Sequence, residues 1–430
     1  MKSKVAIVKR FHLKGFISLN LLLLSLFFYS CSSKDAPSES LNADQILGNP
    51  DYQAISYGGY RTNNRDTQPS ISELKEDLRI LSSMNIKLLR TYNVHLPHAQ
   101  NLLQAIKELK EEDENFEMYV MLGAWINCLN AWTELEPDHD KESPGNEAEI
   151  SKAADLANQY PDIVKIIAVG NEAMVKWATS YYVQPGVILK WVTYLQNLKK
   201  EGKLSANLWI TSSDNFASWG GGSEEYHVED LNKLISAVDF VSMHTYPMHD
   251  THYNSDFWTI KDSIEIQNDS IEIAKAMSRA LDYAKMQYNL VKKYLDSIGI
   301  DKPIHIGETG WASYADGHYG LDGSKACDEY KQYLYYRDLR SWTNQDSISC
   351  FFFEAFDESW KDAGNPSGSE NHFGLFTIDG KAKYAIWDLV DEKVFDSLTR
   401  GGNQITKSWN GNKDSIMINV NIPPIKNANK

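Results

Sequence analysis

Two glutamates stand where carboxylate chemistry would be expected. Glu172 follows the apolar run 166–169 and a Gly-Asn pair, and Glu308 follows the run 304–306 and a glycine. A short apolar run that ends at glycine is typical of a buried strand that ends in a turn. Such a turn lifts the carboxylate out of the sheet toward a cleft. Two carboxylates that face one another are what cleavage of a glycosidic bond requires.

Each glutamate has a simpler interpretation when it is taken alone, as a solvated acid at the end of a strand. The neighbouring residues argue against that interpretation for the pair. Asn171 directly precedes one glutamate, and Trp311 lies three residues after the other. Amide and indole side chains beside paired acids favour a functional site.

The segments that must position these glutamates alternate between strand-like and helix-like patterns. Eight nearly continuous apolar runs predict strands at 54–57, 86–91, 118–122, 164–169, 208–211, 240–243, 304–307 and 350–353. Such runs are typical of parallel strands covered on both faces. Helices are predicted between them, for example after a capping-box pattern at 70–73, over 96–111, and after Pro185.

Eight strands alternating with helices predict an α/β fold, a single (β/α)8 barrel. A doubly wound open sheet is the alternative. It is disfavoured because Gly58-Gly59 lacks the third glycine and the helix start of a phosphate-binding loop. In a barrel, catalytic residues lie at the C-terminal ends of the strands. Glu172 follows the fourth predicted strand, and Glu308 ends the seventh.

Other polar residues follow the predicted strands at the same end of the barrel. They are Tyr57, Arg90, Tyr92, Trp125, Asn127, Asp214, Asn215, His244, Tyr246, Glu354, Asp357 and Glu358. Their convergence is the strongest argument for an enzyme. The connection from the sixth to the seventh strand carries an aromatic and acidic stretch, 249–268, and then a helix to about residue 295. We expect the stretch to form part of a cleft wall.

The N-terminus predicts export. Five cations and no acid lie in residues 1–15, ahead of the apolar run 16–30. This run suits the hydrophobic region of an export signal better than a membrane span. Cys31 follows a small residue, as at the lipidation site of bacterial lipoproteins, although Phe28 and Tyr29 depart from the usual pattern. We therefore expect a signal peptide at 1–30, a lipid anchor on Cys31 at a bacterial membrane, cell-surface or periplasmic, and a flexible tether over 31–50. Simple cleavage near Ser30 is the alternative.

The barrel domain is predicted at 51–395, and the polar remainder, 396–430, is predicted to be a C-terminal tail. The formal net charge of −15 disfavours nucleic acid and anionic lipid as partners, whereas a neutral polymer stays compatible. The 12 tryptophans and 23 tyrosines suit packing on sugar rings, although core packing explains most of them. The three other cysteines, Cys128, Cys327 and Cys350, match no zinc or redox spacing, so no metal, cofactor or disulfide framework is expected. A monomer is expected.

These motifs resemble glycoside hydrolase family 17, the β-1,3-glucanases, over roughly residues 50–395. The Gly-Glu-Thr-Gly-Trp run at 307–311 is highly specific to that family, and the Val-Gly-Asn-Glu run at 169–172 is moderately specific. Residues 352–361 resemble the microbial form of the family's last strand, and 370–376 resemble its closing segment. The resemblance implies a (β/α)8 barrel with retaining chemistry.

By this resemblance Glu308 is the nucleophile and Glu172 the general acid/base, and the proton donor needs a raised pKa while its partner stays ionised. Asn171 would bind the sugar 2-hydroxyl. Arg90 would help keep Glu308 charged, and Tyr246 would hydrogen-bond it. Further substrate-binding positions implied by the resemblance are Tyr92, Glu354, Glu358, Lys361 and Glu370, with Trp311 and Phe373 as sugar platforms. The alternatives are a salt-bridged rim for the charged residues and plugs over the barrel mouth for the two aromatic ones.

One residue departs from the family pattern. Proline commonly follows the tryptophan of the nucleophile motif, and here it is Ala312, which puts the shape of the adjacent subsite and the chain-length preference in doubt. The sequence predicts an endo-acting β-1,3-glucanase. A β-1,3-glucanosyltransferase is the alternative on the same carboxylates. A non-catalytic glycan-binding lipoprotein, or a barrel glycosidase for β-1,4 or β-1,6 glucan, is less favoured.

Overall fold

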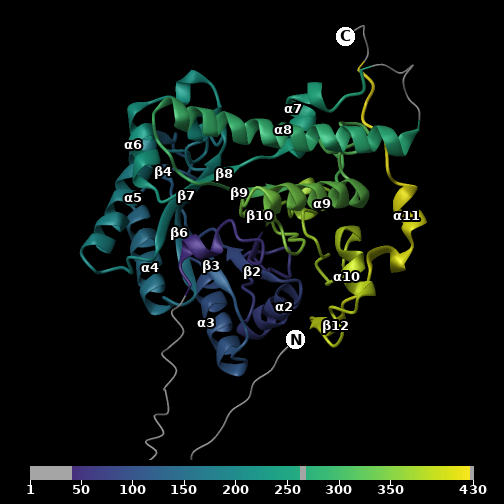
Figure 1. The fold of residues 1–430 in the computed structure, drawn as a ribbon, viewed down its shortest axis with the longest axis horizontal. Helices are drawn as coiled ribbons and strands as arrows, with labels where there is room; N and C mark the ends of the chain where they lie inside the picture. The colour runs from purple at the N-terminus through teal and green to yellow at the C-terminus, as the bar shows by residue number, and fades with distance from the viewer. Residues whose placement is uncertain (1–40, 262–267, 427–430) are drawn as a thin grey trace, which may run out of the picture. The chain divides into compact units, whose positions relative to one another are not determined.

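A computed structural model of the protein describes residues 41–261 and 268–426, and every structural statement below concerns these residues. They belong to one compact unit (Figure 1). The predicted signal segment 1–30 and Cys31 lie outside the described residues. Within the described part, no helix is long and apolar enough to cross a membrane.

Eight parallel strands close into a barrel in the order β1-β10-β9-β8-β7-β6-β3-β2. The strands are β1 (Gln53–Ser56), β2 (Ile86–Arg90), β3 (Tyr119–Ala124), β6 (Val164–Asn171), β7 (Trp209–Asn215), β8 (Val241–His244), β9 (Ile304–Gly310) and β10 (Cys350–Phe353). Each corresponds to one of the eight predicted runs. The predicted (β/α)8 barrel is therefore confirmed, and the open doubly wound sheet is wrong.

Helices run between consecutive strands and cover the barrel (Figure 1). They are α2 (Ile71–Ser83), α3 (Pro97–Glu112), α4 (Asn146–Gln159), α5 (Pro185–Lys200), α6 (Glu229–Ala237), α7 (Pro247–Tyr253), α8 (Asp269–Ser297) and α9 (Glu329–Gln345). The capping box predicted at the start of α2 is present, with Ser70 and Glu73 each bonded to the other's backbone. A two-stranded hairpin, β4 (Cys128–Leu129) and β5 (Asp138–Glu142), is inserted after β3.

Successive residues of the barrel strands enter two different cores. Ile55, Leu89 and Ile167 pack into the large core, which also holds the apolar faces of the helices. Their neighbours Leu88 and Ile166 belong to a second, smaller cluster. This alternation follows from the two-residue period of a strand: one set faces the helices and the other fills the barrel interior.

The smaller cluster is completed by residues from the predicted tether. Helix α1 (Ala43–Ile46) contributes Ala43 and Ile46 to it, and Leu47 follows. All three side chains are buried. Residues 41–50 are therefore part of the folded unit, because their apolar side chains cover the interior of the barrel, and the flexible tether predicted at 31–50 is wrong for this part.

The segment predicted to be a polar tail also packs on the barrel. It contains α11 (Lys413–Met417) and the short pair β11 (Thr399–Arg400) and β12 (Asn403–Gln404), and it follows α10 (Trp387–Asp391). Arg400 is buried and forms an ion pair with the fully buried Asp77 of α2 at 2.9 Å. The described part of 396–430 thus belongs to the same compact unit as the barrel. Its few apolar residues and one buried arginine, rather than overall polarity, determine its packing.

Candidate active site

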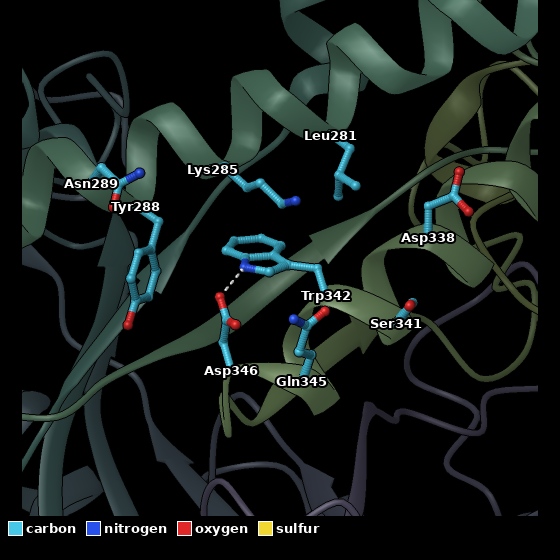
Figure 2. Close-up of a pocket in the computed structure, with 9 residues that line it drawn as sticks. All are labelled: Leu281, Lys285, Tyr288, Asn289, Asp338, Ser341, Trp342, Gln345 and Asp346. Atoms are coloured by element: carbon cyan, nitrogen blue, oxygen red, sulfur yellow. Dashed lines mark hydrogen bonds between the residues drawn. The ribbon is translucent and has the colours of Figure 1, made fainter.

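Two hollows compete as the functional site. The first, of about 410 Å³, lies between α8 and α9 on the outside of the barrel (Figure 2). Figure 2 shows Lys285 over the indole ring of Trp342, whose Nε1 donates to Asp346 at 2.8 Å. The ring is nearly buried and its polar atom is already bonded. This hollow contains neither predicted catalytic glutamate.

The second hollow is a cleft of about 760 Å³ at the C-terminal ends of the barrel strands. It contains Glu308. The other residues that line it are Tyr57, Gly58, Tyr60, Arg65, Tyr92, Asn93, His95, His98, Trp125, Asn127, Trp132, Asn171, Tyr181, Phe353, Glu358, Trp360, Lys361 and Glu370. Its position is the one at which barrel enzymes bind substrate.

Glu308 is held as an ionised carboxylate. Its Oε2 accepts from the Arg90 guanidinium at 2.5 Å and from the Tyr92 hydroxyl at 2.7 Å. Its Oε1 accepts from the Tyr246 hydroxyl at 2.7 Å. Burial by itself would raise the pKa of Glu308, but the charge of Arg90, with contributions from His244 and the two phenols, outweighs burial and lowers the pKa to about 2.

Arg90 also sets the orientation of Asn171. One guanidinium nitrogen donates to Glu308 and the other to Asn171 Oδ1 at 2.5 Å. Arginine has no acceptor, so the atom that it contacts is the amide oxygen. The NH₂ group of Asn171, which lines the cleft, is thereby left to donate to a ligand.

Glu172 has the opposite protonation state. Burial and the nearby charge of Glu308 raise its pKa to about 8, although Arg90 acts against this shift. Glu172 Oε1 lies 3.1 Å from His244 Nδ1. Burial lowers the pKa of His244 to about 3, so the imidazole is neutral. A partly exposed, protonated carboxyl, with 15% of its side chain accessible, therefore lies within the electrostatic field of a buried, ionised carboxylate. Two carboxyl groups whose surroundings separate their pKa values are the pattern of an acid and its ionised partner.

The glycines that precede the two glutamates, Gly170 and Gly307, are required for different structural reasons. Gly170 has φ +82°, and a Cβ there would also lie 2.9 Å from Ala173 Cβ. This turn carries Glu172, itself at φ +46°, out of β6. A Cβ on Gly307 would lie 2.1 Å from Ser242 Oγ. Glycine is thus required at 307 because a serine side chain occupies that space.

Two serine hydroxyl groups and one aspartate hold the residues that contact or follow Glu172. Ser213 Oγ lies 2.8 Å from His244 Nε2 and 2.9 Å from Ser242 Oγ, so the imidazole is bonded at both nitrogens. Asp214 Oδ2 accepts from the Met174 backbone N–H at 2.7 Å and holds the turn after Glu172. Burial raises the pKa of Asp214 to about 7.

The predicted charged residues divide between the cleft and its support. Glu358, Lys361 and Glu370 line the cleft. Glu354 is buried and accepts from Lys361 Nζ at 2.5 Å. The tryptophan Nε1 of Trp360 donates to Glu358 at 2.9 Å. Lys361 therefore lines the cleft with its ammonium group paired to two carboxylates, Glu354 at 2.5 Å and Glu358 at 3.6 Å.

Trp311 and Phe373 are not sugar platforms in this structure. Both are fully buried. Trp311 Nε1 donates to the Ala326 carbonyl at 2.8 Å, and its ring packs against Trp258 and Tyr335. A ring without an accessible face cannot stack on a sugar, so the platform interpretation is wrong for both, and both belong to the large hydrophobic core.

Four aromatic residues of the cleft were not singled out from the sequence: Tyr60, Trp132, Tyr181 and Trp360. They come from loops after β1, β3, β6 and β10, respectively. No strand-end pattern marks loop positions, because the loops vary in length and their side chains meet only in the fold. The stretch 249–268 was predicted to form part of a cleft wall, but none of its described residues lines the cleft. Its His249 lies 4.0 Å from Glu370, which does.

Within residues 41–261 and 268–426, no group of three or more His, Cys, Asp and Glu side chains has an arrangement that could hold a metal ion. The three cysteines of the described chain are free thiols. The side chains that hydrogen-bond the Glu308 and Glu172 carboxyl groups are the Arg90 guanidinium, the Tyr92 and Tyr246 phenols and the His244 imidazole.

The chain was then compared with known proteins. Residues 54–374 match the BtgE/BtgC glycoside hydrolase domain. The crystal structure of an endo-laminarinase from Formosa Hel1_33_131 is similar at 63% sequence identity and a TM-score of 0.89, over 90% of this chain and 98% of that one.

More distant relatives have lower identity. A glucan 1,3-beta-glucosidase of Arthroderma benhamiae is 24% identical over 64% of this chain and 73% of its own length. A probable glucan endo-1,3-beta-glucosidase BtgC of Aspergillus terreus is 24% identical over 71% of this chain but only 40% of its own length. A Rhizomucor miehei beta-1,3-glucanosyltransferase mutant in complex with laminaritriose shares the fold, at 20% identity and a TM-score of 0.53 over 78% of this chain and 96% of that one. The chain is a glycosidase and belongs to the BtgE/BtgC glycoside hydrolase family.

Proposed function

We propose that this protein is a retaining endo-β-1,3-glucanase of glycoside hydrolase family 17 that hydrolyses laminarin-type glucan, with Glu308 as nucleophile and Glu172 as general acid/base. The observation that carries the proposal is a pair of interacting carboxyl groups in opposite surroundings: Glu308, in the cleft, accepts from Arg90 and two phenols, whereas Glu172 faces the neutral imidazole of His244. The substrate class rests on the similarity to the endo-laminarinase at 63% identity.

In the first step, Glu308 attacks the anomeric carbon of the glucosyl unit at the cleavage point. Glu172 gives its proton to the glycosidic oxygen, and the bond from that oxygen to the anomeric carbon breaks. The products are a glucosyl ester of Glu308 and a shortened chain with a free hydroxyl. Asn171, oriented by Arg90, donates to the 2-hydroxyl, and this hydrogen bond strengthens as positive charge develops on the sugar.

In the second step, Glu172, now ionised, takes a proton from water, and the water oxygen attacks the anomeric carbon. The ester bond to Glu308 breaks, so the nucleophile and the acid are both regenerated. Two inversions give net retention. If a sugar hydroxyl replaced water here, the same groups would perform glucanosyl transfer.

The predicted cellular setting belongs to the same proposal. The N-terminal pattern favours export and a lipid anchor on Cys31, which would hold the enzyme at a bacterial membrane beside its polymeric substrate. We expect a monomer. Metabolic labelling with a fatty acid in a bacterial host, with Cys31→Ser as the control, tests the anchor; equal label in both proteins would overturn it.

The first test follows the products of laminarin over time. Wild-type protein should release a ladder of β-1,3-linked oligosaccharides whose new reducing ends are first β by NMR. Glu308→Gln should lower the rate by about 10⁴-fold or more, as expected when a covalent nucleophile is lost. Glu172→Gln should cost about 10²–10⁴-fold, the range for a general acid. Products longer than an oligosaccharide substrate would indicate transfer instead.

Azide separates the two roles. The substrate is an aryl β-1,3-gluco-oligosaccharide, whose phenolate leaves without the proton of Glu172. In Glu172→Ala, azide should attack the glucosyl ester, raise the rate and give a β-glucosyl azide. In Glu308→Ala, azide takes the place of the nucleophile and should give the α-azide. The reverse pattern, or no response of either variant, would contradict the assignment.

A further inference from the structure

We infer that Trp132, stacked on Tyr181 in the loop between β4 and β5, forms a further glucan-binding subsite of the cleft, a flat platform for a sugar ring other than the one attacked by Glu308. The inference rests on the proposed function, because it takes the ligand to be a β-1,3-glucan chain. It adds a residue that determines chain-length preference.

Trp132 combines two properties that packing does not explain. It is 63% exposed, and its backbone is left-handed at φ +61°. A bulky residue in this conformation is disfavoured by sterics. One face of its ring is stacked on Tyr181, with centroids 5.2 Å apart and an angle of 23°. The large exposure therefore leaves the opposite face open.

The polar edge of the platform is also prepared for a ligand. The indole N–H groups of Trp125 and Trp132 lie 2.6 Å and 3.3 Å, respectively, from the same atom, Asn127 Oδ1. An indole N–H can only donate, so this atom is the amide oxygen. The NH₂ group of Asn127 has no hydrogen-bond partner among the described residues and can donate to a sugar hydroxyl. An aromatic face beside a free amide donor is the combination that binds one ring of a neutral sugar.

The platform is held rigidly by contacts at the base of the hairpin. Cys128 N–H donates to the Tyr181 carbonyl at 3.0 Å. The imidazole of His139 stacks on Tyr182, with centroids 3.6 Å apart, and Glu142 accepts from Trp191 Nε1 of α5 at 2.6 Å. A preformed platform binds ligand without the entropic cost of ordering it.

The position of the platform identifies its occupant. Trp132, Tyr181 and Asn127 line the same continuous cleft as Asn171 and Glu308. Its volume of about 760 Å³ is within the range of about 300–1,000 Å³ of small-molecule sites and exceeds what one sugar ring needs. A chain bound at Glu308 can therefore extend onto Trp132, so the platform acts on longer glucans and not on the shortest ones.

The test measures kcat and KM for a series of purified β-1,3-gluco-oligosaccharides and laminarin. Trp132→Ala should lower kcat/KM by about three- to tenfold for long chains, as expected for one lost aromatic contact. The shortest chain that wild type cleaves should be unaffected. Trp132→Phe should lower kcat/KM for long chains less than Trp132→Ala does, because phenylalanine keeps an aromatic face. In the Glu308→Gln background, adding Trp132→Ala should weaken the binding of laminarin by the same factor.

Trp409→Ala is the matched control. Trp409 is also exposed, also left-handed at φ +52°, and its indole N–H also bonds a polar side chain, Glu329, but it does not line the cleft. Trp409→Ala should leave kcat and KM unchanged for every substrate. If Trp132→Ala behaved as Trp409→Ala does, or lost equal activity on all chain lengths, the inference would be overturned. A wild-type enzyme inactive on β-1,3-glucan would instead refute the proposed function.

Discussion

Glu172 and Glu308 have identical side chains, and their surroundings favour opposite protonation states. Arg90 and two phenols face Glu308 and stabilise its charge. Glu172 faces a neutral imidazole and lies within the field of the charged Glu308, so its protonated form is preferred. Because the two groups interact, each assists the other: the ionised nucleophile keeps the acid protonated.

This arrangement predicts the pH dependence of kcat/KM. Activity needs Glu308 ionised, and its lowered pKa of about 2 means that this condition holds at all but extreme acidity. Activity also needs Glu172 protonated. The value of kcat/KM should therefore fall tenfold per pH unit once the pH rises through about 8. The measurement is kcat/KM on laminarin from acidic to alkaline pH.

Glu172→Gln is the control for this profile, because an amide does not titrate. Its residual activity should lack the alkaline limb. If the alkaline limb persisted in this variant at the same pH, another group would be responsible. Asp214 is the neighbour to test next, because burial raises its pKa to about 7.

At the scale of elements, the segment 396–426 stabilises the barrel through one buried ion pair. Asp77 of α2 is fully buried and is bonded by Arg400 and also by Arg61. Arg400 further packs its guanidinium 4.1 Å from the Phe356 ring centroid, close to the last barrel strand. The segment thus connects the first helix of the barrel to its closing region.

Removing this contact should destabilise the whole domain. Arg400→Ala leaves the buried carboxylate of Asp77 with Arg61 as its one cationic partner among the described residues and with the Tyr57 hydroxyl. We expect the free energy of unfolding to fall by about 3 kcal/mol, near the range for breaking a buried pair. Urea denaturation measures this change. Lys426→Ala, which breaks the exposed pair with Asp256, is the control and should have almost no effect. Equal effects of the two variants would contradict a supporting role for Arg400.

At the scale of the whole molecule, the chain has a formal net charge of −15, and the proposed substrate is a neutral polymer. Such a charge repels polyanions, but an uncharged glucan releases no counterions when it binds. Recognition then depends on stacking and hydrogen bonds inside the cleft, which salt screens weakly.

The consequence is a KM that is insensitive to salt. Between about 0.05 M and 0.5 M NaCl we expect KM for laminarin to change less than about twofold, whereas long-range charge interactions would be largely screened over this range. A sulfated β-glucan should bind poorly at low salt and better at high salt. A strong salt dependence with neutral laminarin would indicate that charge, not stacking, dominates binding.

The sequence by itself determined the barrel and the two glutamates. All eight apolar runs became strands, because a strand buried on both faces must be apolar throughout, and this requirement is local. The glycine before Glu308 and the Gly-Asn pair before Glu172 likewise marked strand ends. Burial in the barrel then placed Arg90 and Tyr246 beside Glu308, where the resemblance had put them.

Only the tertiary structure decided which aromatic side chains are open to a ligand. Trp311 and Trp132 are the same residue type near polar motifs, yet one is fully buried and the other is 63% exposed. Their exposure depends on what packs over them: Trp258 and Tyr335 on the first, and a single face of Tyr181 on the second. These partners lie at least twenty residues away along the chain, so no local pattern specifies them. The same holds for the pairing of Arg400 with Asp77.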